Sequence, residues 1–470
     1  MTPQAPAAAA VVLGLLNHVY FNRCEPQSIN VSFLAIIIQP VALTLAFNAF
    51  SVAKVLTTTF IFLATLALSI GVYHLSPWHP LAHIPGPTLA KISKWWSVRL
   101  VLSGDQHRVF KALHDHYGDF VRVGPNEISV IHVDAIKSVF GRGGFPKGQY
   151  YEPRVDPIHG TRSLLTSRGD AHANRRRIWN RGMSSQSLLA FELILEKHLK
   201  QMLEHFDKFA STRSEIDIAA WFSYLMFDFM GDMAFEMLRD GKDNEGYWTL
   251  IKDGAKTIAV LSQLPWLAPA LYKIPMLTRN TKRAQAEVDA VYPDPDSVFD
   301  SLKHGELPYL TACFNEALRL YPPVPTGGPR QIPPGAATVI AQKMIPENTQ
   351  VYVPAYAVHR NPRHFFPDPD KFDPDRWLGS SNEGLHHRAF IPFSYGAANC
   401  VGKGLAWCEM RMVASALLKR YELRFGAGME ENGSWVDTLD DVFVTSVGGK
   451  LLAGVPGDYM NQKTVVREMP

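Results

Sequence analysis

The sequence predicts a mainly α-helical protein with small β-sheets, preceded by N-terminal transmembrane helices. Three observations predict this class. Long stretches after residue 76 carry apolar residues at helical spacing, and β-type runs there are few and short. Uncharged apolar segments precede residue 76. We therefore expect residues 1–75 to form a membrane-anchor region and residues 76–470 to form one soluble domain.

The composition is that of a folded protein with a large core. Hydrophobic residues make up 47% of the chain and charged residues 19%, unlike the polar, charged composition of disordered proteins. The formal net charge is +3 and no long Lys/Arg run occurs, so we expect no nucleic-acid partner. The cysteines form no CxxC pair, which argues against a disulfide framework or a zinc site and favours a reducing, cytosol-facing environment; they are Cys24, Cys313, Cys400 and Cys408.

The clearest membrane segment is residues 55–73, which carry no charge and form a predicted transmembrane helix. At about 1.5 Å per residue this length approaches the roughly 30 Å of bilayer hydrocarbon. Residues 31–50 form a second predicted transmembrane helix, although Gln39 and Pro40 lie mid-span. Residues 7–16 have the length of a signal-peptide core but lack a clear cleavage site. The alternative for each segment is a buried core helix.

Two features follow the anchor. Residues 76–87 contain four prolines, which remove backbone donors, so this stretch should be a stiff connector rather than a helix. The basic residues Lys91, Lys94 and Arg99 lie close to the membrane, and the positive-inside rule then predicts a cytosolic soluble domain.

Regular elements are predicted at five places in the soluble domain. Apolar residues recur at helical spacing over Gln186–Ala210 and Ile216–Leu238, and short β-type runs cover Phe120–Val123, Glu127–Ile131 and Gln350–Val353.

One cysteine has surroundings suited to a metal ligand. Gly396 and Gly402 flank Cys400 and would allow a tight turn close to a flat ligand. A helix that starts just after Cys400 would direct its N–H groups at the sulfur and favour a thiolate. A haem iron needs such a ligand when electron density must be pushed toward an O–O bond. Taken alone, Cys400 fits a small buried hydrophobe better, because that is the commonest role of a lone cysteine.

The segment FSYGAANCVGKGLA, residues 393–406, resembles the haem-binding loop of the cytochrome P-450 family. That loop has the pattern Phe-x-x-Gly-x-x-x-Cys-x-Gly-x-x-x-Ala, and every fixed position matches. The resemblance implies that Cys400 is the axial ligand of the haem iron, and that Phe393, Gly396 and Gly402 belong to the cofactor-binding loop. It extends from about Pro77 to Lys450, and the multi-span N-terminus resembles fungal microsomal members.

Two upstream segments resemble the family's Glu-x-x-Arg helix and its later arginine segment. Glu316 and Arg319 stand three residues apart on a predicted helix, and Arg376 follows in the sequence FDPDRW. Such a pair alone is ordinarily a surface ion pair worth a few tenths of a kcal/mol. The resemblance implies that the three charged residues form a buried structural network behind the haem.

Three further residues resemble the family's propionate-binding positions. His172 and Arg176 match the Trp-x-x-x-Arg pattern, with histidine in place of tryptophan; both can donate hydrogen bonds. A basic solvated helix face is the alternative, which fits the neighbouring arginines better than Arg176. Arg330 lies where many members place a second donor. Ala398 replaces the Arg or His that often provides a third, which predicts weaker propionate binding.

The resemblance also implies the activity. The chain would be a haem-thiolate monooxygenase with heme b that receives electrons from NADPH through NADPH-cytochrome P-450 reductase. It would insert one oxygen atom from O2 into a lipophilic small molecule. We expect it in the endoplasmic reticulum membrane, with the haem domain facing the cytosol.

The family's distal helix, with the pattern Ala-Gly-x-Asp/Glu-Thr, is not found between Met237 and the Glu-x-x-Arg helix. The catalytic acid and threonine are therefore unassigned. Residues 264–267 resemble the loop well before that helix and residues 282–289 the helix just after it. About a dozen residues lie between, whereas about thirty are needed to cross the haem. The distal helix is predicted to be missing.

Residues 254–257 offer a rival distal helix, because their glycine-to-threonine spacing is right. Lys256 stands where the acid should be, however, and Pro265 and Pro269 would end the helix too early. The alternative function is therefore a haem-binding or haem-free, catalytically inactive splice form or truncated gene product.

Overall fold

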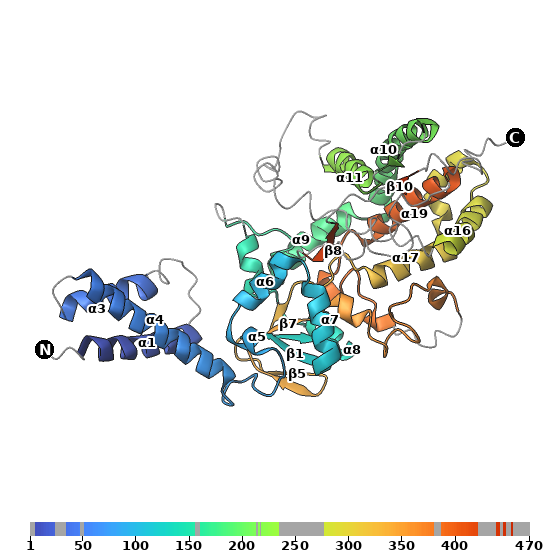
Figure 1. Cartoon of the computed structure of the whole chain (residues 1–470). Helices are drawn as coiled ribbons and strands as arrows, with labels where there is room; N and C mark the ends of the chain where they lie inside the picture. The colour runs from blue at the N-terminus through green and yellow to red at the C-terminus, as the bar shows by residue number, and fades with distance from the viewer. Residues whose placement is uncertain are drawn as a thin grey trace. The chain divides into compact units, whose positions relative to one another are not determined.

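The chain forms two compact units in a computed structural model (Figure 1). One unit comprises Met1–Ser97 and Arg122–Asn126, and the other Val98–Val121 and Glu127–Pro470. The structure describes residues 5–23, 34–47, 51–155, 160–212, 215–216, 218–234, 277–379, 387–421, 439–441, 445–447 and 453–454. Helices dominate and the sheets are small, which confirms the predicted fold class.

The N-terminal unit begins with apolar helices. In chain order these are α1 (Ala5–Arg23), the π-helix η1 (Leu34–Ile38), α3 (Gln39–Phe47) and α4 (Val52–Leu75). By length and composition, α1 and α4 could cross a membrane. The predicted span at 55–73 lies within α4. The predicted span at 31–50 overlaps η1 and α3, whose apolar helical part is shorter, and residues 7–16 form part of the longer α1.

The connector after α4 contains no helix, as its prolines predict. It leads into α5 (Thr88–Ile92), which Pro87 precedes as the N-cap residue, and then into α6 (Trp95–Ser103). Gly86 lies so close to the backbone of Arg122 that an added Cβ would come within 2.2 Å of its carbonyl oxygen. The glycine therefore lets the connector pack directly on β1.

The larger unit contains the other described helices. The α-helices are α7 (Gln106–Tyr117), α8 (Val133–Phe140), α9 (Gly169–Gly182), α10 (Ser185–Thr212), α11 (Ile218–Ala234), α16 (Leu277–Val291), α17 (Pro308–Leu320), α18 (Ala355–Val358) and α19 (Lys403–Arg420). The 3-10 helices are η2 (Gln149–Arg154), η4 (Pro295–Phe299), η5 (Ser301–Glu306), η6 (Pro374–Trp377), η7 (His387–Ala389) and η8 (Gly396–Ala398). The predicted helix over 186–210 is part of α10, and α11 covers most of the predicted helix over 216–238.

The largest sheet has four strands in the order β1-β2-β7-β4. They are β1 (Phe120–Gly124), β2 (Glu127–Val130), β7 (Gln350–Tyr352) and β4 (Arg330–Gln331), so all three predicted β-type runs form strands. β2 and β7 are parallel, and β4 pairs antiparallel with β7, which sets Arg330 opposite Val351.

Three two-stranded sheets complete the fold. They are β3 (Glu215–Ile216) with β10 (Ala453–Gly454), β5 (Thr338–Ile340) with β6 (Lys343–Ile345), and β8 (Leu439–Asp441) with β9 (Thr445–Val447). All three pairings are antiparallel.

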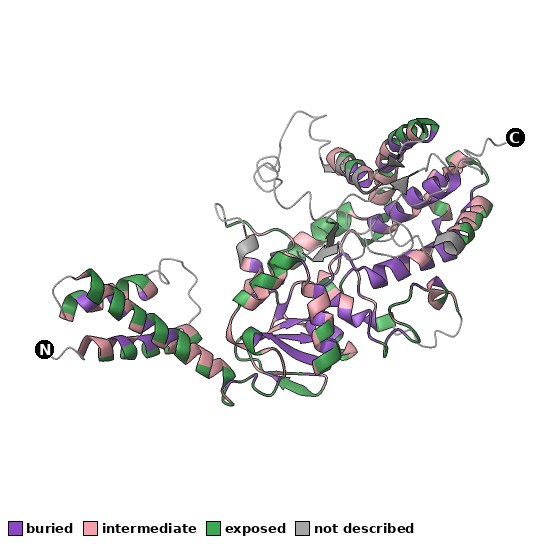
Figure 2. Ribbon diagram, in the orientation of Figure 1, coloured by how far each residue is buried: buried purple, intermediate pink, exposed green. Residues whose placement is uncertain are grey.

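The hydrophobic core of the larger unit lies among α10, α11, α16, α17 and α19. Figure 2 shows α17 and α19 as largely buried helices. α19 is apolar on most sides and is packed by neighbours on several of them, as expected of a central helix. It begins three residues after Cys400, so the core holds the base of the candidate site.

Candidate haem site

Cys400 lies in a short loop between η8 and α19. Its backbone N–H donates to the carbonyl oxygen of Phe393 at 2.9 Å, which closes the loop on itself. The side chain of Phe393 is buried, and its ring centroid lies 6.3 Å from that of Trp407 on α19. The sequence motif thus folds into one compact turn anchored on the core helix.

The two glycines of the loop have different roles. Gly396 has a φ of 74°, and an added Cβ would lie 1.9 Å from the carbonyl oxygen of Phe140, so only glycine lets the loop rest on the end of α8. Gly402 has an ordinary φ of −81°. An added Cβ there would meet the sulfur of Cys400 at 4.0 Å. Gly402 therefore leaves space beside the sulfur rather than permitting an unusual backbone conformation.

The expectation that this loop by itself favours a thiolate is wrong. Burial raises the pKa of the Cys400 thiol above its usual value, and this effect outweighs the Gly402 N–H and the nearby Arg176, which lower it. Coordination of a metal ion is the usual way in which a protein holds a buried cysteine as the thiolate. The loop presents the sulfur, and iron would have to stabilise its negative charge.

Arg176 connects α9 to the cysteine loop. Its guanidinium donates to both the backbone oxygen and the side-chain Oδ1 of Asn399, the residue before Cys400. Its Nε donates to Asn180 on its own helix at 2.8 Å. Arg176 thus lies beside the loop and holds its backbone.

A group of basic side chains lies near Arg176. Arg330 and Lys147 form a β-bridge and are both buried, and their charges together with that of Arg176 lower the pKa of His172, after the larger effect of its burial. Burial and the neighbouring arginines likewise lower the pKa of Lys147 to about 8. Four residues that can carry positive charge therefore lie near one another.

These residues fit the haem that the resemblance implies. The Nε of Arg330 is buried and has no hydrogen-bond partner in the described part of the chain. Within the same part, none of the four side chains forms an ion pair with a carboxylate, so the positive charge of Arg176, Arg330 and Lys147 has no anionic partner there. Two propionates would supply the compensating negative charge. Cys400 would hold the iron, while Arg176, Arg330 and His172 would face the propionates.

Glu316, Arg319 and Arg376 meet in the interior. Arg319 binds Glu316 through two hydrogen bonds of 2.7 and 2.8 Å, and Arg376 Nε lies 3.1 Å from the same carboxylate. The side chains of Glu316 and Arg319 are fully buried. Trp377 Nε1 and the Asp373 backbone N–H also donate to Glu316. The spacing of three residues therefore produces a buried network here rather than a surface ion pair.

Three other residues contribute and were not predicted from the sequence. Asn399 could have been suspected from its position next to Cys400. Lys147 lies in no motif and reaches the site only through its bridge to Arg330. His359 touches the network through the carbonyl oxygen of Arg319, and no local sequence signal indicates this.

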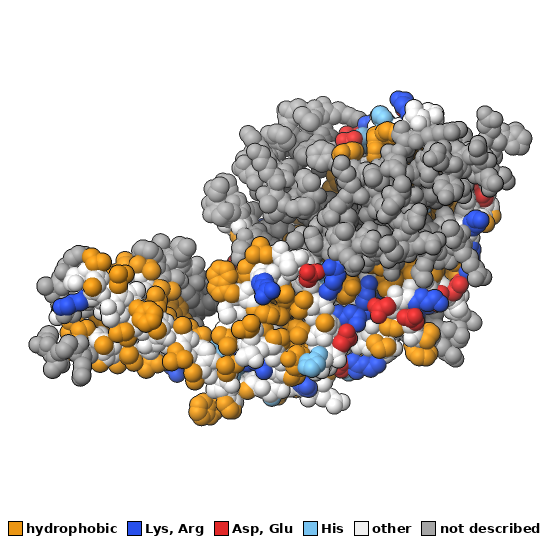
Figure 3. Space-filling model, in the orientation of Figure 1, with side chains coloured by type: hydrophobic (Ala, Val, Ile, Leu, Met, Phe, Trp, Pro, Cys, Tyr) orange, Lys and Arg blue, Asp and Glu red, His pale blue; other side chains and the backbone are white. Residues whose placement is uncertain are grey.

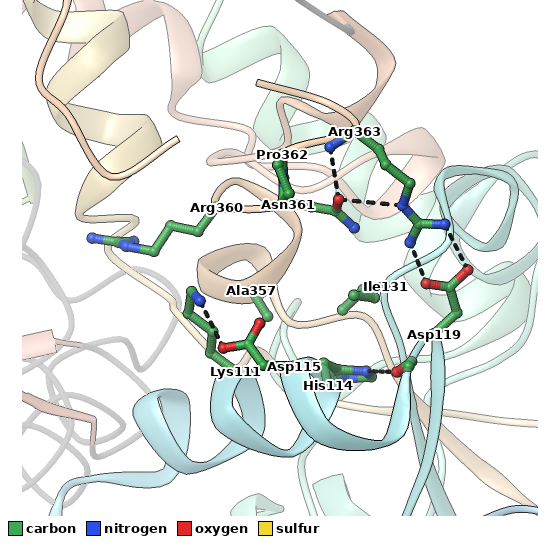
Figure 4. Close-up of a pocket in the computed structure, with 11 residues that line it drawn as sticks. Lys111, His114, Asp115, Asp119, Ile131, Ala357, Arg360, Asn361, Pro362 and Arg363 are labelled. Atoms are coloured by element: carbon green, nitrogen blue, oxygen red, sulfur yellow. Dashed lines mark hydrogen bonds and ion pairs between the residues drawn. The ribbon is translucent and has the colours of Figure 1, made fainter. Parts of the chain in front are cut away.

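A pocket of about 340 Å3 lies elsewhere, between α7 and the segment that follows α18 (Figure 4). Its charged side chains are largely paired: Lys111 with Asp115, and Arg363 with Asp119. Arg360 points away from the cavity in this view. The pocket contains none of the predicted cofactor-binding residues.

The distal region lies outside the described residues. This applies to Gly254, Lys256 and Thr257 of the rival distal helix and to the loop at 264–267. The helix that should follow the distal helix is α16, and it begins at Leu277 rather than at 282.

Comparisons with known proteins agree with the motifs. The family model described as Cytochrome P450 matches residues 85–281 and 264–434. Cytochrome P450 67 of Uromyces fabae is 27% identical over 522 positions, covering 91% of this chain and 96% of the relative. Tryprostatin B 6-hydroxylase of Aspergillus fumigatus is 27% identical, with coverage of 78% and 79%.

A solved structure shows the same fold. The crystal structure of the cytochrome P450 CYP102L1 is similar with a TM-score of 0.58 and 17% identity, covering 74% of this chain and 93% of that one. The predicted resemblance, including that to fungal members, is thereby confirmed.

Proposed function

The chain belongs to the cytochrome P450 family, and from this we propose that it is a haem-thiolate monooxygenase with Cys400 as the iron ligand. We further propose that it binds heme b, receives electrons from NADPH through a cytochrome P450 reductase, and oxidises a lipophilic small molecule. Bound haem supplies the O2 chemistry. The chain's own residues hold and orient the cofactor.

The observation that carries this proposal is the surroundings of Cys400. The loop is closed by the Cys400–Phe393 hydrogen bond and seated on α8 through Gly396. Arg176 lies beside that loop and belongs to the group of basic residues that have no carboxylate partner among the described residues. A thiol with basic residues nearby fits one ligand that is metallic at its centre and anionic at its edge.

Membrane attachment is part of the proposal. α4 is long and apolar enough to span a bilayer and leads through the proline connector to Lys91, Lys94 and Arg99. The positive-inside rule then favours a cytosolic haem domain. We propose the endoplasmic reticulum membrane, where the reductase partner would be encountered.

The ferrous carbon monoxide spectrum of the purified full chain tests the ligand. We expect the red-shifted Soret band of a thiolate ligand, its loss in Cys400→Ser, and its retention in Cys408→Ser. Cys408 is a suitable control because it is buried on α19, where its thiol donates to Glu192. Haem content measured beside each spectrum separates a lost cofactor from a changed ligand. A thiolate band in Cys400→Ser would refute the assignment.

A second candidate function is an inactive haem protein that lacks the distal helix. The alignment with the Uromyces fabae relative spans 522 positions but includes only 91% of this 470-residue chain, about 428 residues. About 94 positions therefore hold a residue of the relative and none of this chain. The family model also matches in two pieces that share residues 264–281. Both observations favour an internal deletion.

The start of α16 supports the same deletion. Because α16 begins at Leu277, only residues 268–276 separate it from the loop at 264–267. Nine residues cannot form the helix of about thirty that would cross a haem. We therefore propose monooxygenation as the family role and impaired turnover for the chain with this sequence.

A further inference from the structure

The three N-terminal helical segments, α1, η1–α3 and α4, form a bundle whose outer surface is apolar. Large hydrophobic side chains point outward from each: Val12 and Leu16 from α1, Leu45 from α3, and Leu56, Phe60 and Leu68 from α4. Phe60 is 72% exposed and Leu68 70%. Figure 3 shows hydrophobic side chains over most of the visible face of these helices. A water-soluble bundle would not present such a surface.

The interior of the same bundle contains polar side chains. Asn17 is 5% exposed, and its Nδ2 donates to Gln39 Oε1 at 2.7 Å, which joins α1 to α3. Thr44 and Thr58 are also buried, and Thr44 donates to the Pro40 carbonyl at 2.8 Å. Polar groups inside and apolar groups outside are the arrangement expected of helices surrounded by lipid.

The contacts also fix the direction of each helix. Along α1, Gly14 lies against Phe62 and Thr65, and His18 lies against Tyr73, so α1 and α4 run parallel. Gln39, at the start of α3, meets Asn17, whereas Leu43 packs on the cluster that contains Ala10. α3 therefore runs antiparallel to α1, as Figure 1 also shows.

We infer that α1, η1–α3 and α4 form a three-pass membrane bundle that places the N-terminal end of α1 and the haem domain on opposite sides of the membrane. Two parallel spans require the chain to return between them, and η1–α3 is the antiparallel segment that does so. The inference rests on the membrane anchoring proposed above and adds its topology. The lipid bilayer is the partner of the apolar outer surface.

Basic residues are distributed as this topology requires. Arg23 ends α1, and Lys91 and Lys94 follow α4, so these charges belong to one side of the membrane. Lys54, near the start of α4, belongs to the other. Three positive charges lie on the side of Arg23, Lys91 and Lys94 and one on the side of Lys54, so the positive-inside rule favours the cytosol for the side with three.

The middle pass is short. η1 has 5 residues and α3 has 9, which gives about 21 Å of helix, so this pass needs its flanking residues or a locally thin bilayer.

Glycosylation mapping tests the topology. The chain has two Asn-x-Ser/Thr sequences, at Asn30 and Asn432, which N30Q and N432Q remove. In this background a flexible acceptor tag is fused either ahead of Met1 or after Pro470, and the full chain is expressed in microsomes. We expect a glycan, removable by endoglycosidase H, on the N-terminal tag and none on the C-terminal tag.

Three other outcomes would refute the topology. Two unmodified tags in a protein that resists alkaline carbonate extraction would mean an even number of passes. Loss of the tag together with α1 would show that α1 is a cleaved signal sequence. Glycosylation of both tags would place both ends on one side. Release of the protein by carbonate is distinguishable from these, because it would refute the proposed anchoring itself.

Cysteine cross-linking tests the parallel packing independently. In a chain with Cys24→Ser, the pair Gly14→Cys and Thr65→Cys brings two sulfurs onto facing positions, since a Cβ at Gly14 would lie 3.1 Å from Thr65 Cβ. After oxidation in membranes and solubilisation in detergent, trypsin cleaves at Arg23 and Lys54, and we expect the two helices to stay joined until reductant is added. Thr57→Cys, on the exposed face of α4, is the matched control. Cross-linking of the control pair alone would refute the packing.

Discussion

At the scale of single residues, His359 shows how the charge network is coupled to the segment that leads into the cysteine loop. The ring is fully buried, with Nδ1 placed 3.1 Å from the carbonyl oxygen of Arg319 and Nε2 placed 2.9 Å from the N–H of Ile391. A neutral ring with its proton on Nδ1 donates to the first and accepts from the second. Burial, assisted by the charge of Arg319, lowers its pKa from 6.5 to about 3.

This shift predicts acid sensitivity. Below pH 6.5 the unfolded chain takes up a proton on His359 that the folded chain does not, so folding stability falls as the pH falls toward 3. Between pH 7 and pH 5 the loss from this residue should be about 2 kcal/mol. Urea unfolding at the two pH values should show it. His359→Gln, which can donate and accept but does not titrate, should lower stability at pH 7 and abolish this part of the pH dependence. An unchanged pH dependence would contradict the assignment.

Which site residues are predictable from the sequence depends on how each acts. Cys400 and Gly396 act through their spacing within one loop, so a linear motif identifies them. Lys147 and His359 act through contacts between segments far apart in the chain, and no local pattern reports such contacts. The sequence also does not reveal the raised pKa of the Cys400 thiol, because the depth of burial is a property of the folded core.

At the scale of elements, Arg319 joins α17 to the segment that leads into η6. Its guanidinium binds Glu316 on its own helix and donates to the backbone oxygens of Pro369 and Lys371. Arg376, on η6, reaches back to Glu316. Removing Arg319 would leave the buried carboxylate with one cationic partner and would leave three backbone carbonyl oxygens, that of His359 included, without their donor.

We therefore predict that Arg319→Ala costs about 3–5 kcal/mol of stability and yields little haem-loaded protein. Arg108→Ala is the matched control: Arg108 pairs with Asp105 at the same spacing of three, but at the surface, and its loss should cost at most about 1 kcal/mol. Denaturant unfolding and haem content of both variants measure the difference. Similar costs for the two substitutions would mean that the buried network adds nothing beyond an ordinary ion pair.

Long periodic helices and short strands were predictable because their pattern is local. α10 contains the predicted range with little extension, and the three β-type runs lie in β1, β2 and β7. The first helix was harder, since α1 carries polar residues such as Asn17 and Asn22 within an apolar stretch. Their role becomes clear only through the partner helix, where Asn17 finds Gln39.

At the scale of the whole molecule, the ordered motifs identify the family, and the interval before α16 decides whether the chain can perform the family's reaction. An acid–alcohol pair on the distal helix relays protons, and its apolar surface excludes water. The sequence between Met237 and α17 contains no Ala-Gly-x-Asp/Glu-Thr pattern. General acid–base groups typically contribute about 10²–10⁴-fold in rate, so we expect their loss to lower the rate of substrate oxidation by a similar factor.

We accordingly predict that the reductase-coupled chain consumes NADPH mainly to form hydrogen peroxide and oxidises lipophilic probes such as lauric acid negligibly. A helix of about thirty residues carrying that pattern should be inserted before Leu277, where α16 begins, so that α16 stays intact. Probe oxidation per NADPH should then rise by at least about 100-fold.

A matched insert with alanine in place of the acid and the threonine controls for added length. Thr257→Ala in the original chain should change nothing. Well-coupled oxidation by the original chain, lost on Thr257→Ala, would instead identify residues 254–257 as the distal site.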